Sequence, residues 1–158
     1  MEKKQYIESQ MAKLIQTWMS VSAILGIFLF MSLSLLDYFV TPENYNRFFI
    51  YRISISLFLF LLFLLNRLKR KLYYQYIIIV IGIVFSAVTL ELMILNFGGH
   101  KSIYYAGLNL LILCVLGVLP LNLPIALSIS TLLYCIYLFP ILMLDKITNL
   151  GLFINNNV

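Results

Sequence analysis

Long runs of apolar residues, divided by short polar and charged clusters, are the feature that most constrains this chain. A bilayer core requires about 20 predominantly apolar residues for each helix that spans it. Five runs meet or approach this length. They predict an all-α integral membrane protein, a five-helix transmembrane bundle that forms one domain over residues 1–158. The predicted spans are about 14–40, 48–65, 73–95, 103–119 and 124–144.

The composition agrees with a membrane protein. Hydrophobic residues make up 63% of the chain and charged residues only 11%, whereas soluble domains carry about 25% charged residues. The net charge of +5 does not indicate nucleic acid, because no basic face or basic arm with stacking aromatic residues accompanies it. The lipid bilayer is the expected partner, and no room is left for a soluble catalytic domain.

The positions of Lys and Arg predict the orientation, since cytoplasmic loops collect these residues. A cytoplasmic N-terminus puts seven of them inside and four outside. The inner set is Lys3, Lys4, Lys13, Arg67, Lys69, Arg70 and Lys71, and the outer set is Arg47, Arg52, Lys101 and Lys146. The N-terminus lacks the features of a signal peptide, so the first span is expected to remain as an anchor in the inner (cytoplasmic) membrane, which the chain crosses several times.

Glu91 is the first candidate for a functional residue. It lies four residues before Leu95, about one helical turn below the outer surface. Ionisable groups inside a membrane are costly and therefore suggest function. Two interpretations stay open: the carboxylate reaches the interface or pairs with Arg52 or Lys101, or it lines a ligand or ion pocket. Arg52 itself, one turn into the second span, is expected to extend its side chain outward to the interface.

His100 is the only histidine, and it follows two glycines that allow the backbone to fold tightly. Imidazole titrates near neutral pH, so His100 is a candidate proton or ligand sensor, or else a plain loop residue. A zinc site needs three or four protein ligands, and none is predicted; no haem or other cofactor is predicted either. Tyr104, Tyr105 and Asn109 extend the cluster, because residues four apart share a helix face. Asn109 is expected to seek a partner such as Glu91, whereas the tyrosines are also ordinary interface residues.

No arrangement of catalytic residues is evident, and the chain is not expected to be an enzyme. Cys114 and Cys135 lie inside apolar runs without metal-ligand spacing. We interpret both as small core residues that do not bridge each other.

The stretch 97–110, FGGHKSIYYAGLNL, and the following turn 120–124, PLNLP, resemble the N-terminal six-helix sensor region of bacterial signalling proteins. In those proteins the region precedes a histidine kinase, diguanylate cyclase or adenylyl cyclase module, including kinases of two-component systems. The resemblance implies a sensory input domain, homodimeric in the intact sensor, that binds a small hydrophobic ligand near Glu91, His100, Tyr104, Tyr105 and Asn109.

The same resemblance implies that residues 145–158 form a tail or the start of a missing sixth span, so that any enzymatic output would lie in a domain absent from this chain. Two other functions stay open: a small transporter or channel subunit, and a membrane anchoring subunit without a ligand. The transporter is disfavoured, because inverted repeats are absent and polar residues are scarce at mid-membrane.

Overall fold

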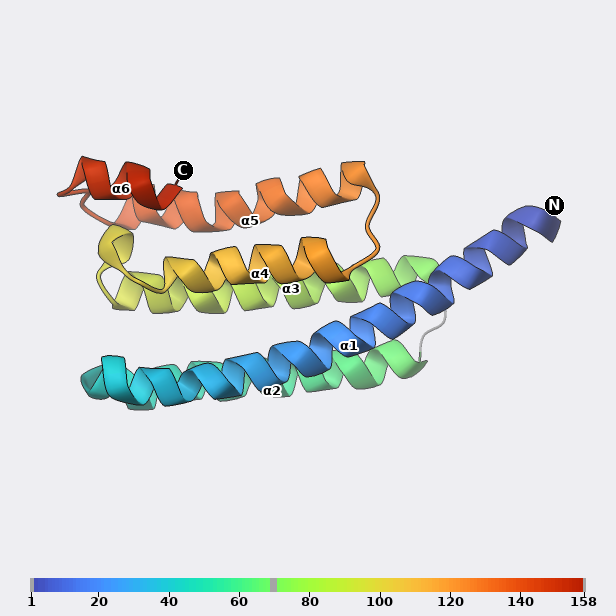
Figure 1. Ribbon diagram of the computed structural model, residues 1–158, viewed down its shortest axis with the longest axis horizontal. Coiled ribbons are helices and arrows are strands. Elements are labelled where there is room, and N and C mark those ends of the chain that lie inside the picture. Colours follow the sequence, from blue (N-terminus) through green and yellow to red (C-terminus); the bar gives the residue numbers. More distant parts are fainter. Residues whose placement is uncertain (1, 69–70, 158) are drawn as a thin grey trace. The chain divides into compact units, whose positions relative to one another are not determined.

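The computed structural model describes residues 2–68 and 71–157, and throughout these ranges the only regular secondary structure is helical. The all-α fold class is therefore confirmed. In chain order the elements are α1 (Glu2–Val40), η1 (Pro42–Asn44), α2 (Tyr45–Leu68), α3 (Leu72–Asn96), η2 (Gly99–Lys101), α4 (Tyr105–Val118), α5 (Leu123–Leu144) and α6 (Leu150–Asn157) (Figure 1).

Among the described residues, four helices are long and apolar enough to cross a membrane, namely those within residues 6–40, 42–68, 72–96 and 123–144. The fourth predicted span, 103–119, is the shorter helix α4 of 14 residues, about 21 Å long at the usual rise. Large apolar side chains such as Phe28 and Leu113 are exposed along the helices, as expected for contact with lipid. The chain is thus a bundle of membrane helices.

The first of two compact units comprises residues 1–83 and 117–120. In it, α1 and α2 form an antiparallel hairpin through the turn η1, where Pro42 opens the 3-10 helix. Near the other end of the hairpin, two amides clasp the helices together. Gln16 Nε2 donates to the carbonyl of Asn66 at 2.6 Å, and Asn66 Nδ2 donates to the carbonyl of Gln16 at 2.9 Å. This clasp fixes the register of α1 against α2.

The second unit comprises residues 84–116 and 121–158, and it contains the C-terminal half of α3 with most of α4, α5 and α6. Gly107 of α4 lies against Leu90 of α3. Asn122 caps α5, because its Oδ1 accepts a hydrogen bond from the backbone N–H of Ile125 at 3.3 Å. Pro124 lies in the first turn of α5, as predicted, and the helix continues through Pro140 to Leu144.

Two details of the sequence interpretation change in the structure. Cys114 and Cys135 are free, as predicted, but both are exposed rather than in a core. The tail that was predicted after residue 145 contains the short helix α6, which lies beside η2.

Candidate functional site

The turn between α3 and α4 has a backbone that requires glycine. Gly98 and Gly99 have φ angles of 93° and 56°, and within the described residues no other residue has a positive φ. Glycine adopts this region without the steric cost that a Cβ brings. The following 3-10 turn closes with hydrogen bonds from Lys101 N to Gly98 O at 3.1 Å and from Ser102 N to Gly99 O at 2.9 Å. These hydrogen bonds and the two glycines make a tight turn between α3 and α4.

Asp145, at the end of α5, occupies the space that this turn creates. Its Oδ2 accepts a hydrogen bond from the backbone N–H of His100 at 2.7 Å and lies 2.7 Å from Nδ1 of the same residue. A Cβ on Gly99 would lie 2.1 Å from that oxygen, so glycine is needed here for space as well as for φ. We call this arrangement of Gly98, Gly99, His100 and Asp145 the latch. It joins the α3–α4 turn to the end of α5.

The latch holds an ionised carboxylate. Partial burial raises the pKa of Asp145, but hydrogen bonds from the backbone and ring of His100, the charge of that ring and the backbone N–H of Lys146 together outweigh it, and the pKa lies below its ordinary value. An ionised carboxylate only accepts hydrogen bonds, so Nδ1 of His100 carries the shared proton. The latch is therefore an imidazole and a carboxylate held at one end of the second unit.

The other predicted site residues lie in different environments. Glu91 is buried on α3, and neither of its carboxylate oxygens has a hydrogen-bond partner among the described residues. Tyr104 packs edge-on against Phe97, with ring centroids 5.5 Å apart, and so belongs to the same turn as His100. Tyr105 is half-buried, whereas Asn109 is exposed. The expected pairing of Asn109 with Glu91 is therefore not formed.

Sequence reasoning also placed Arg52 wrongly. Its guanidinium does not extend to the interface but is buried against Asp37 of α1, with side-chain exposures of 3% and 2%. Nε donates to Oδ2, and Nη2 donates to Oδ1 at 3.0 Å. Such two-point contacts are the strongest form of Arg–carboxylate pairing. The pair joins α1 to α2 close to η1.

Asp145 and Asp37 are the site residues that sequence reasoning missed. The available signal was position in the topology. Asp145 follows the end of a span on the same side as the loop that contains His100. Asp37 and Arg52 lie on either side of the turn between α1 and α2 that contains η1. For metals, no group of three or more His, Cys, Asp or Glu that could hold an ion occurs in the described part of the chain.

Several long apolar helices, with apolar side chains facing outward, define a multi-pass membrane protein. The model of the MASE8 family matches residues 35–158, which is most of the chain, and the chain therefore belongs to this family of membrane-associated sensory domains. The match includes the latch and the Asp37–Arg52 pair. Comparisons with curated proteins and with solved structures give no match.

Proposed function

We propose that this chain is the sensory input domain of a bacterial signalling protein in the inner membrane, and that the latch is where its stimulus acts. A ligand or a proton changes the contact between His100 and Asp145 near the outer leaflet, and the helices rearrange in response. Any kinase or cyclase activity belongs to a cytoplasmic effector that receives this rearrangement.

The observation that carries the proposal is that one carboxylate oxygen holds two parts of the chain that lie 45 residues apart. Such a contact has two states, closed and open, and a ligand that binds one state better shifts the population toward it. Family membership supports a sensory role. The apolar surroundings of α3 and α4 suit a small hydrophobic ligand, since such sites combine an apolar body with few polar groups.

Glu91 is the second element of the proposal. A buried carboxylate without a protein partner among the described residues is costly in a membrane unless it serves a ligand or an ion. Glu91, Tyr104 and Tyr105 line the ligand site in this proposal, with Asn109 on the outer face of α4. In the intact sensor we propose a homodimer, as in the signalling proteins that the sequence resembles.

The test is a signalling reporter driven by the intact protein. The Glu91→Gln variant should alter the response to ligand while membrane insertion stays normal. The His100→Ala variant should alter the pH dependence of the output, because it removes the ring that contacts Asp145 in the latch. Asp145 itself stays ionised at neutral pH, because its pKa is lowered. Its contribution to the stability of the folded chain is therefore fully present above its ordinary pKa and is lost only as the pH falls through the lowered value.

Expression of each variant would be checked by immunoblot, and Lys101→Ala, an exposed change in the same turn, is the matched control. Normal output at normal expression from both the Glu91 and the His100 variants would refute the site. A transporter or channel subunit would instead show solute flux, and an anchoring subunit would show neither flux nor a response.

The orientation gives a further prediction. With the N-terminus in the cytoplasm, the 96–102 loop is external and the 66–72 segment is internal, because Lys and Arg divide that way. In a background without Cys114 and Cys135, a membrane-impermeant thiol reagent added to intact cells should label Lys101→Cys and not Lys69→Cys. Position 69 lies outside the described residues, and Lys71→Cys gives the same test at a described position. Labelling at 69 or 71 with none at 101 would reverse the orientation.

A further inference from the structure

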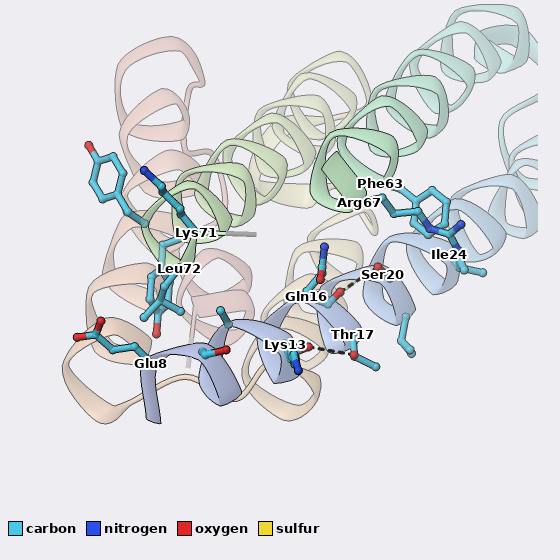
Figure 2. A pocket seen from close by; sticks show the side chains of 15 residues that line it. Glu8, Lys13, Gln16, Thr17, Ser20, Ile24, Phe63, Arg67, Lys71 and Leu72 are labelled. Atoms are coloured by element: carbon cyan, nitrogen blue, oxygen red, sulfur yellow. Dashed lines mark hydrogen bonds between the residues drawn. The ribbon is translucent and has the colours of Figure 1, made fainter. Parts of the chain in front are cut away.

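An open groove of about 1310 Å³ lies in the first unit, between the N-terminal half of α1, the end of α2 and the start of α3. Figure 2 shows the α1 side chains along one wall, with Phe63 and Arg67 of α2, Lys71 just before α3 and Leu72 of α3 around them. Gln16 and Ser20 line it, and both are held by Asn66 of α2, whose Nδ2 donates to the Gln16 carbonyl and to Ser20 Oγ at 3.2 Å. The polar lining is thus fixed by the amide clasp.

The groove is positively charged. Lys13, Arg67 and Lys71 line it with Glu8 as the one carboxylate of the lining, and all four side chains are exposed. In the part of the chain that is described, none of the three cations forms a salt bridge. These residues belong to the end of the hairpin that the positive-inside rule places in the cytoplasm.

The lining of the groove changes from charged and polar to apolar along α1. Glu8, Ser9 and Lys13 lie toward the N-terminus, whereas Val21 and Ile24 lie about two to four turns further along the helix. At the apolar end the guanidinium carbon of Arg67 lies 4.7 Å from the ring centroid of Phe63. An arginine whose guanidinium lies over an aromatic ring keeps N–H donors available to an anion.

We propose that this groove binds an anionic phospholipid. Arg67 holds the phosphate, Lys13 and Lys71 add positive charge toward the N-terminal end of α1, and an acyl chain runs beside Ile24 and Phe63. Basic pockets between membrane helices on the cytoplasmic side bind anionic headgroups in this way. The charge of the groove favours an anionic lipid over a zwitterionic one, and the apolar side chains at one end, among them Val21 and Ile24, favour a lipid over a soluble anion.

Trp18 gives a direct readout, because it is the only tryptophan of the chain and lies on α1 between the groove residues Thr17 and Ser20. The full chain would be reconstituted in phosphatidylcholine vesicles that contain increasing fractions of brominated phosphatidylglycerol or, separately, brominated phosphatidylcholine. We expect half-maximal quenching of Trp18 fluorescence at a mole fraction of brominated phosphatidylglycerol about tenfold lower than that of brominated phosphatidylcholine. Each Lys or Arg near an anionic headgroup adds to the attraction for that lipid.

The triple variant Lys13→Gln, Arg67→Gln, Lys71→Gln should lose this preference. The matched control, Arg47→Gln with Lys101→Gln and Lys146→Gln, removes the same charge from exposed positions outside the groove and should keep it. Glu8→Gln should strengthen the preference, which guards against a variant that has merely misfolded. Equal preference in the two triple variants, whether kept or lost, would overturn the proposal, and so would an unchanged or weaker preference in Glu8→Gln.

Discussion

Replacing Arg52 with alanine is expected to lower the free energy of unfolding by about 3–5 kcal/mol, because it leaves the Asp37 carboxylate buried without its counter-charge. Asp37→Ala should lower the free energy of unfolding by a similar amount, since it leaves the Arg52 guanidinium buried without its counter-charge. The measurement is unfolding of the purified chain from mild detergent micelles as a denaturing detergent is added, followed by far-UV circular dichroism.

Two controls make this result specific to the pair. Arg47→Ala removes the same charge from an exposed position on the same helix and should cost at most about 1 kcal/mol. The double variant Asp37→Leu, Arg52→Met removes both charges and should recover most of the loss, because a buried ion pair is often no more stable than apolar residues of similar size. If the double variant lost as much as the sum of the single variants, the pair would not be acting as a unit.

Gly99→Ala should have the second largest effect. A positive φ costs an alanine about 1–2 kcal/mol, and the new Cβ would also displace the Asp145 carboxylate, with a loss of about 1.5–3 kcal/mol for hydrogen bonds to a charged group. The same unfolding measurement would detect both contributions. In the intact protein the latch should then be open whatever the stimulus, so the reporter output should become constant.

Gly98→Ala separates the two contributions. Gly98 also has a positive φ, but the nearest atom to a Cβ there is the backbone nitrogen of Ser102 at 3.9 Å, so this variant should show backbone strain alone. In an Asp145→Ala background the cost of Gly99→Ala should fall toward that of strain. An unchanged cost in that background would show that Gly99 does not act through Asp145.

The sequence predicted the fold class well because membrane helices must satisfy their backbone internally and present apolar side chains to lipid. Long apolar runs therefore mark helices directly, and α2, α3 and α5 begin and end within three residues of the predicted spans. Helix α1 begins at Glu2, twelve residues before the predicted start of the first span at 14. An apolar run reports where lipid begins, and a helix can continue past that point in water.

Pairings between side chains were much harder to predict. Gly98 and Gly99 before His100 indicated a tight turn, because glycine adopts the positive-φ conformations that such turns require. Nothing local to that stretch indicates Asp145, which is 45 residues away. Pairing of Glu91 with Arg52 was one of the interpretations left open, but Arg52 pairs with Asp37 instead. Which faces of two helices meet is not determined by spacing along one helix. The groove between α1, the end of α2 and the start of α3 is formed by residues far apart in the sequence. It therefore could not be predicted from the sequence alone.

The length of α1 has a mechanical consequence. The helix has 39 residues without interruption, about 58 Å at the usual rise, and its clasp to α2 through Gln16 leaves about four turns that continue past the end of its partner. From the clasp at Gln16 to Glu2 the helix is a lever about 21 Å long. A tilt of about 15° around the clasp moves the N-terminal end by about 5 Å, so a modest rotation there becomes a displacement as large as a helical turn.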